Sequence, residues 1–380
     1  MYDLVLKGGR VIDPAAGLDT NCDVAFKAGR IAAVQPDIDP KLSAASLDVA
    51  HQIVTPGLID LHTHIYWGGT SLGVDPTKYA KQSGTTTLID AGSAGPGNFA
   101  GFREHIIKPA DPKIYAYLNI SFAGIYAFSD RVMVGECADI RLLSALDCVD
   151  VVDANRDLIV GIKVRVGMVA GGASGISPLD VALEVAEETG LPVMCHLDNP
   201  PPSRMDVVSR LRPGDVLTHC FRPFPGAPAR RDGHVYEEIV AARERGVMFD
   251  IGHGMGSFGF VTAESMLNAG FLPDCISSDV HAMSAKGPAY DLLVTLSKLM
   301  DMGMTLPEVI AAATVGPAKA IGKPELGSLA IGTPGDVSIL EMREGPVVFA
   351  DSAGKTREAN QRLDVSGMVI DGQVWPGKAN

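Results

Sequence analysis

Two histidines that could bind a metal stand two residues apart near the start of the chain, in the stretch TPGLIDLHTH. They are His62 and His64, and they follow a short apolar segment with the composition of a buried strand. Residues i and i+2 of a strand project to the same side of a sheet, so both imidazoles would face one site. An HxH pair also arises by chance, and alone it gives weak support for a metal site.

Other candidate ligands also stand at the ends of strand-like segments. His196 follows PVMC, His219 follows VLT, and Asp279 ends DCISSD. Lys163 interrupts VGIKVRV, although a lysine is almost never fully buried without a partner. Each residue alone could be an ordinary satisfied polar group, but that explanation is improbable for all of them together. Imidazole and carboxylate groups are natural ligands of zinc and similar divalent ions.

The segments that carry these residues alternate with helix patterns. The strand candidates are residues 57–64, 85–90, 114–120, 158–164, 192–196, 215–219, 247–251 and 275–279. One helix pattern, SPLDVALEVAEETG, has Ser177 and Asp180 as expected capping residues and Gly190 as its expected end. Strand–helix units repeated over roughly 265 residues match a (β/α)₈ barrel, which places its active site at the carboxyl ends of the strands. A doubly wound sheet is the main alternative, but no glycine-rich nucleotide motif stands at a strand–helix junction.

The two ends of the chain have a different pattern. Segments such as YDLVLKGGRVID near the start and GSLAIGTPGDVSIL near the end alternate apolar residues with glycine-rich turns, which is typical of antiparallel hairpins. We therefore expect an α/β protein with a TIM-like barrel at residues 56–323. A small β-sandwich domain would be formed by residues 1–55 together with residues 324–380.

Composition limits the partners and the compartment. The net charge of −13 argues against nucleic acid and anionic membrane surfaces, and leaves a small-molecule substrate. The six cysteines stand singly without a CxxC pair, so we expect reduced thiols, with Cys195 and Cys220 facing away from the site. The chain starts directly with a strand pattern and has no apolar run of about 18 residues, which predicts a cytoplasmic enzyme.

Taken in order, the pieces TPGLIDLHTH, GIKV, CHLD, LTHC, SSDVHA and GSLAIGTPGDVSIL make the chain resemble the amidohydrolase superfamily over nearly its whole length. The resemblance implies a barrel that binds two divalent metals, usually zinc, and hydrolyses an amide, a cyclic amide or an ester. Manganese, cobalt or iron would also suit these ligands. Barrels of this superfamily commonly form oligomers, so a homo-oligomer is expected.

The resemblance also assigns roles to the candidate ligands. The implied metal-binding residues are His62, His64, Lys163, His196, His219 and Asp279. The first two histidines and Asp279 would hold the more buried metal, and the other two histidines would hold the second. Lys163, carboxylated by CO₂, would bridge both metals, since a desolvated lysine has a depressed pKa and an accessible neutral amine. Asp279 would act as general base and then general acid.

The substrate is less well defined. The chain is similar to a bacterial dihydroorotase-like subgroup whose members deacetylate α-hydroxy acids, as in acetyl-(R)-mandelate, and related N-acyl compounds. Dihydroorotases usually carry an arginine two residues after the second histidine of HxH, where this chain has Tyr66. We therefore favour a deacetylase over a cyclic amidase of the dihydroorotase or hydantoinase kind. A non-catalytic relative is a third possibility. Such a relative would lack some of the metal ligands, and this chain has all of them.

A carboxylate-bearing substrate needs a cationic anchor. Arg165 lies two residues after the predicted bridging lysine and should face the same side, although it could instead pair with an acid at the rim. Tyr66 and Trp67, in the first loop of the barrel, and His253, after the seventh strand, are further predicted substrate contacts. Arg222, which follows a predicted ligand histidine, is a weaker candidate for the anchor.

Overall fold

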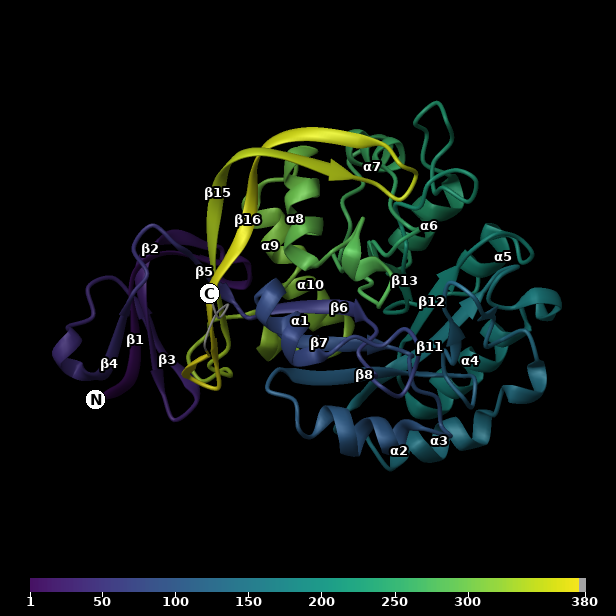
Figure 1. The fold of residues 1–380 in the computed structure, drawn as a ribbon, viewed down its shortest axis with the longest axis horizontal. Helices are drawn as coiled ribbons and strands as arrows, with labels where there is room; N and C mark the ends of the chain where they lie inside the picture. Colours follow the sequence, from purple (N-terminus) through teal and green to yellow (C-terminus); the bar gives the residue numbers. More distant parts are fainter. Residues whose placement is uncertain (376–380) are drawn as a thin grey trace.

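The computed structural model describes residues 1–375 (Figure 1). Its larger part is an α/β unit, and the strands of the chain's two ends form a second sheet beside it, at the left of Figure 1. None of the helices within residues 1–375 is long and apolar enough to cross a membrane. All six cysteines are buried and unpaired, as expected for reduced thiols.

The α/β unit is built on a curled parallel sheet of seven strands. In spatial order the strands are β6 (Leu58–Thr63), β7 (Thr85–Ala91), β8 (Lys113–Asn119), β11 (Ile159–Val166), β12 (Val193–Leu197), β13 (Val216–Leu217) and β14 (Met248–Phe249). Every residue of β6, β7 and β11 is buried, which is the environment that their β-branched composition predicts. Because all pairs are parallel, the carboxyl ends of the strands meet at one edge.

The predicted eighth strand is present only as two isolated bridges within the described chain. Cys275 bridges to Asp250 beside β14, and Val280 bridges to Thr63 at the end of β6. Between them Asp279 has a φ of 47°, in the left-handed region that a continuous strand does not contain. The fold is therefore a mixed α/β fold with a curled parallel sheet, and a complete eight-stranded barrel is not confirmed.

Helices connect the strands of the parallel sheet and continue after its last strand, β14. They are α1 (Pro76–Ser83), α2 (Phe99–Phe102), α3 (Ala145–Asp153), α4 (Ser177–Thr189), α5 (Arg204–Val208), α6 (Glu237–Glu244), α7 (Phe260–Asn268), α8 (Leu292–Asp301), α9 (Leu306–Ala312) and α10 (Val315–Ala320). Helix α4 buries Leu179, Ala182 and Ala186 on one face and ends at Gly190, as predicted. Its expected cap is wrong: Ser177 is the first residue of the helix, and the capping position before it has no side-chain hydrogen bond.

The strands of the two chain ends form one mixed sheet of eight strands. They are β1 (Tyr2–Asp13), β2 (Leu18–Lys27), β3 (Arg30–Gln35), β4 (Ser43–Asp48), β5 (Ile53–Pro56), β15 (Val337–Ala350), β16 (Thr356–Ile370) and β17 (Gln373–Trp375). The two ends join where β5 pairs antiparallel with β15, with Val54 opposite Ile339. The joining of both ends is confirmed, but a sandwich of two packed sheets is not.

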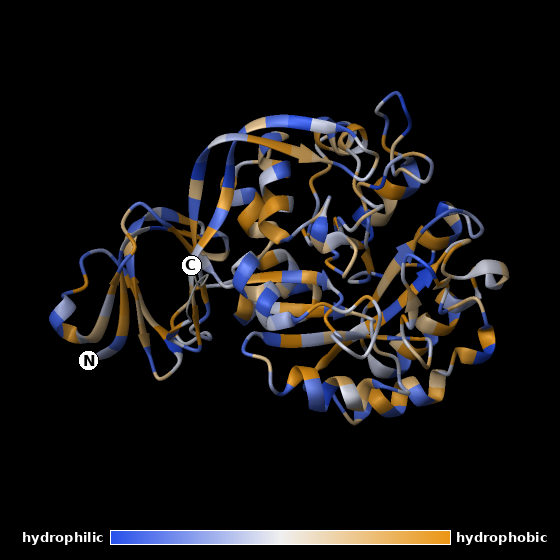
Figure 2. Ribbon diagram, viewed as in Figure 1, coloured by the Kyte–Doolittle hydropathy of each residue, from blue (hydrophilic) through white to orange (hydrophobic). Residues whose placement is uncertain are grey.

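Strands β15 and β16 continue beyond this sheet as a long arm that crosses over α8 and reaches α7 (Figure 1). Hydrophilic and hydrophobic residues are interspersed along the arm (Figure 2). At its tip, the backbone N–H of Ser352 donates to the carbonyl of Phe258, at 2.9 Å. The arm thereby fixes the chain that follows β14, a segment that also lines the cavity described next.

Candidate active site

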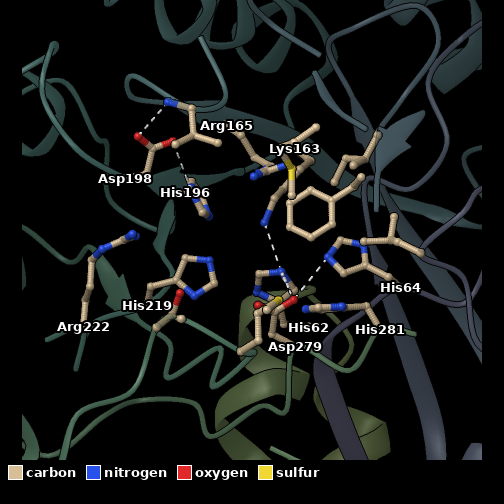
Figure 3. Close-up of a pocket in the computed structure, with 18 residues that line it drawn as sticks. His62, His64, Lys163, Arg165, His196, Asp198, His219, Arg222, Asp279 and His281 are labelled. Atoms are coloured by element: carbon tan, nitrogen blue, oxygen red, sulfur yellow. Dashed lines mark hydrogen bonds and ion pairs between the residues drawn. The ribbon is translucent and has the colours of Figure 1, made fainter. Parts of the chain in front are cut away.

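A cavity of about 180 Å³ opens at the carboxyl edge of the parallel sheet (Figure 3). Its lining includes all six residues that the sequence predicts as metal ligands: His62, His64, Lys163, His196, His219 and Asp279. They come from β6, β11, β12 and the ends of β13 and of the 275–280 segment. Residues up to 217 positions apart in the sequence (279 − 62) therefore meet because they share one edge of the sheet.

The first group of these side chains is in close contact. Asp279 Oδ1 lies 3.5 Å from His62 Nε2 and 3.2 Å from His64 Nε2. Lys163 Nζ lies 3.3 Å from the same His62 nitrogen. The ligand atoms of His62, His64 and Asp279 all lie within 4.8 Å of one another, which is close enough for one cation to contact all three.

The backbone turns sharply at two of the candidate ligands, His219 and Asp279. His219 has a φ of 66° and Asp279 a φ of 47°, conformations that cost a non-glycine residue about 1–3 kcal/mol each. The turn after β13 brings the His219 ring to 4.6 Å from that of His196, measured between centroids. Strain of this kind is retained where it orients a functional side chain.

Hydrogen bonds to the outer ring nitrogens orient the imidazoles. His62 Nδ1 lies 2.9 Å from Thr218 Oγ1, whose hydroxyl donates to Asp250 Oδ2 at 2.7 Å. Because that hydroxyl proton is already used, His62 Nδ1 must be the donor, and its Nε2 lone pair faces the cavity. His219 Nδ1 likewise donates to the carbonyl of Gly252, at 2.7 Å.

One nitrogen in the cavity has no hydrogen-bond partner among the described residues, although a carboxylate oxygen, Asp198 Oδ2, lies 3.8 Å from it. His196 Nε2 is buried and makes no hydrogen bond to a described residue. A buried nitrogen without a partner costs stability unless a ligand binds it. Together with the cluster of His62, His64 and Asp279, this atom fits a site for divalent cations.

Burial also sets the protonation of these groups. It lowers the pKa of His62, His196 and His219 well below the ordinary range and that of His64 to about 3, so all four imidazoles are neutral. Neutral imidazole is the form that binds metals. The same burial lowers the pKa of Lys163 to about 8 and raises that of Asp279 to about 6.

Three predicted substrate contacts do not line the cavity. Tyr66 packs on Phe102 with ring centroids 4.8 Å apart, and Trp67 is 55% exposed. His253 is fully buried, and its Nε2 accepts a hydrogen bond from Lys298 Nζ at 2.8 Å. Their positions in the sequence, next to strand ends, did not determine which way their side chains point.

Arg165 does line the cavity, but it has a protein partner. Its Nη1 donates to Glu136 Oε2 at 3.2 Å, and its guanidinium carbon lies 5.2 Å from the centre of the Phe128 ring. The structure therefore shows the alternative of pairing with an acid, although Glu136 is buried and not exposed at the rim. Arg222 also lines the cavity, and its Nη1 donates to the carbonyl of Leu197 at 2.7 Å.

Several residues of the lining were not predicted from the sequence. Asp198 lies two residues after His196 and accepts hydrogen bonds from the backbone of Val169 and Ala170, so strand alternation was a usable signal for it. Phe128 and Met133 come from a short hairpin, β9 (Ala127–Phe128) and β10 (Met133–Val134), that covers the cavity from outside the parallel sheet. No local pattern marks them.

Comparison with known proteins agrees with this geometry. Residues 53–375 match the model of the Amidohydrolase family. A deacetylase of Brucella anthropi is 35% identical over 348 residues, which are 92% of this chain and 86% of that protein. The crystal structure of an adenine deaminase superposes with a TM-score of 0.92 at 30% identity, over 99% of this chain and 100% of the other.

The crystal structure of a dihydroorotase is similar to the same extent. Its TM-score is 0.90 at 32% identity, and the match covers 100% of this chain and 98% of the other. Members of this family typically depend on two metal ions, in keeping with the ligand cluster in the cavity. The chain belongs to the amidohydrolase family and is a hydrolytic enzyme.

Proposed function

We propose that the protein removes an acyl group from an ester or amide of a small carboxylate-bearing substrate. Examples are an O-acetyl α-hydroxy acid such as acetyl-(R)-mandelate, or an N-acyl analogue. The observation that carries the proposal is one cavity that combines the six candidate ligands with two guanidinium groups. Relatives named deacetylase that are 31–35% identical to this chain support the choice of reaction.

The residues of the cavity would hold two divalent cations, with zinc as the proposed metal. Asp279 with the two histidines of HxH would hold one, and the remaining two histidines the other, with carboxylated Lys163 between them. When bound, such a pair supplies Lewis-acid activation of water and of the scissile carbonyl. The His196 nitrogen without a hydrogen bond and the cluster around Asp279 are the structural support for this arrangement.

The surroundings of Lys163 suit carboxylation. Its side chain is 0% exposed, and burial lowers its pKa to about 8, so a sizeable fraction of the amine is neutral near pH 7–8. The neutral nitrogen can attack CO₂ and release one proton, which converts the neutral amine into a carbamate anion. Space beside the lysine depends on Gly92, where a Cβ would lie 2.6 Å from Lys163 Cγ.

Asp279 is the proposed proton carrier. Its Oδ1 is close to both histidines of HxH. A Cβ added at Gly254 would lie 2.2 Å from its Oδ2, so the carboxylate packs closely against this glycine. The carboxylate would take a proton from the attacking water and return it to the leaving oxygen or nitrogen. The surrounding neutral imidazoles do not compete for that proton.

The test is Asp279→Asn, assayed with a panel of O-acetyl and N-acyl acids together with dihydroorotate and hydantoins. Loss of the proton carrier should lower kcat by about 10²–10⁴-fold while the protein still binds metal. Wild-type protein purified without chelator should contain about two divalent ions per chain. Metal content near zero, or full activity of the variant, would contradict the proposal.

A cyclic amidase is the second candidate, because the dihydroorotase structure is 32% identical to this chain. Against it, Tyr66 stands where dihydroorotases usually carry a substrate-binding arginine, and its hydroxyl donates to the carbonyl of Asn98 away from the cavity. Activity on rings but on no acyl ester or amide in the same panel would favour this candidate.

A further inference from the structure

We propose that Arg222, and not Arg165, binds the carboxylate of the substrate, while the apolar substituent packs against the hairpin that carries Phe128 and Met133. This inference rests on the proposed function and assigns the parts of its substrate to parts of the cavity. It differs from the expectation that the sequence gives, in which Arg165 is the main anchor.

Arg165 is already neutralised inside the protein. It is 7% exposed and Glu136 is 1% exposed, and the two form an ion pair at 3.2 Å. The second oxygen of Glu136, Oε1, is buried without a hydrogen-bond partner, so Arg165 is the main group that stabilises this carboxylate. A substrate that drew Arg165 away would leave a buried anion uncompensated, which is strongly unfavourable.

Arg222 is the cation in the cavity without such a partner. Among the ion pairs within residues 1–375, none includes Arg222. Its guanidinium donates one hydrogen bond to a described residue, to the carbonyl of Leu197. Most of its five N–H groups therefore have no hydrogen-bond acceptor among the described residues. Asp198 is the nearby carboxylate, but it lies beyond ion-pair distance and accepts two backbone hydrogen bonds at 3.1 Å.

The position of Arg222 suits a substrate whose acyl group lies at the predicted metal ligands. The backbone N–H of Arg222 donates to the carbonyl of His219, at 3.1 Å, in the turn that follows β13. Figure 3 shows Arg222 beside His219, across the cavity from His64. A partly desolvated guanidinium at this place has Asp198 nearby but no ion-pair partner within 4 Å among the described residues, and a substrate carboxylate would supply one through two parallel hydrogen bonds.

The rest of the lining selects an apolar substituent. Apolar side chains gather in the lining: Leu72, Ile125, Phe128, Met133, Val169 and Met255. The Phe128 ring stands edge-on to His281 with centroids 5.6 Å apart, and its backbone carbonyl accepts a hydrogen bond from Ser71 Oγ at 3.0 Å. This fixed ring provides a surface for an aryl or alkyl group bonded near the carboxylate.

The experiment compares a charged ligand with a neutral one of the same shape. The substrates are acetyl-(R)-mandelate and its primary amide, and the binding probes are (R)-mandelate and (R)-mandelamide, measured by calorimetry. The variants are Arg222→Met, Arg222→Lys and Arg165→Met, with Arg231→Met as the control, because Arg231 is exposed and does not line the cavity.

Arg222→Met should lower kcat/KM for the acid, and the affinity for (R)-mandelate, by about 10–100-fold, with a much smaller change for both amides. Arg222→Lys should keep part of the preference for the acid, and Arg231→Met should behave as wild type. Equal losses for acid and amide in Arg222→Met, or no loss for either, would overturn the inference. An acid-selective loss in Arg165→Met, with its fold retained, would also overturn it.

The binding measurements with (R)-mandelate and (R)-mandelamide separate this inference from the proposed function. A wild-type protein that hydrolyses no acyl compound but binds (R)-mandelate through Arg222 would refute the function and support the anchor. A protein that hydrolyses acid and amide equally well, with Arg222→Met unchanged, would support the function and refute the anchor. Failure to bind or hydrolyse any of the four compounds would refute both.

Discussion

The hydroxyl of Thr218 offers a sharp test of how the site is oriented. It is buried between two groups, accepting from His62 Nδ1 at 2.9 Å and donating to Asp250 Oδ2 at 2.7 Å. Thr218→Val keeps the shape of the side chain and removes only this link. Thr218→Ser keeps the hydroxyl and loses only a methyl group, so it is the matched control.

The expected magnitude follows from the two lost hydrogen bonds. A hydrogen bond to a charged group contributes about 1.5–3 kcal/mol, and a neutral one about 1 kcal/mol. Asp250 keeps the hydrogen bond from Ser277 Oγ at 2.6 Å, so it does not lose all stabilisation. We therefore expect Thr218→Val to lower the free energy of unfolding of the metal-free protein by about 3 kcal/mol.

The same link fixes which nitrogen of His62 faces the cavity. Mutation of groups that orient a metal ligand typically lowers metal affinity about 10–100-fold. The assays are urea unfolding of chelator-treated protein and zinc competition against a chromogenic chelator. Thr218→Ser should stay near wild type in both. If Thr218→Val matched Thr218→Ser in stability and in zinc affinity, the hydroxyl link would have no orienting role.

Two further predictions concern buried lysines. Lys163→Ala should lose activity and bound metal, and should recover part of both when short-chain carboxylic acids are added to replace the carbamate. Assays of activity and of metal content measure both effects. Absence of any recovery would contradict the role of the carbamate. Lys298→Met removes an ammonium that donates to His253 Nε2 and to two backbone carbonyls at 2.6–2.8 Å, so the free energy of unfolding should fall by about 2–4 kcal/mol. Urea unfolding measures it, with exposed Lys286→Met as control, and equal stability of the two variants would refute the structural role.

The placement of the six candidate ligands at one edge was predictable from the sequence because it depends on local rules. Strand alternation places His62 and His64 on one side, and parallel pairing brings every strand's carboxyl end to the same edge. Both rules operate without knowledge of distant contacts. The seven strands of the parallel sheet were predicted for the same reason, since their apolar composition is a local property.

Side-chain direction in loops could not be predicted in this way. Tyr66, Trp67 and His253 follow strand ends as closely as the ligands do, but contacts with Phe102, solvent and Lys298 decide where they point. The partner of Arg165 could not be predicted either, because Glu136 lies 29 residues earlier in an irregular segment. Such pairings depend on the tertiary fold, so the sequence left them open.

The eighth strand shows how a functional requirement changed a local pattern. Its residues predict a strand, but Ser277 and Ser278 donate their hydroxyls to Asp250 and Asp60, both at 2.6 Å. These side-chain hydrogen bonds tie the segment to both edges of the sheet where ladder pairing is sparse. They also hold the backbone turn that directs Asp279 into the cavity.

Polar groups around the cavity fall into two classes, and the division argues for where ligands bind. The outer carboxylates, Asp250 and Glu136, are compensated by protein donors or by an ion pair. The inner groups are compensated less: among the described residues His196 Nε2 makes no hydrogen bond, and Arg222 forms no ion pair within 4 Å. A folded chain tolerates such costs where binding of a ligand removes them. Metal ions at the imidazoles and an anion at the guanidinium would satisfy these groups together, so the site should be most stable when both are bound.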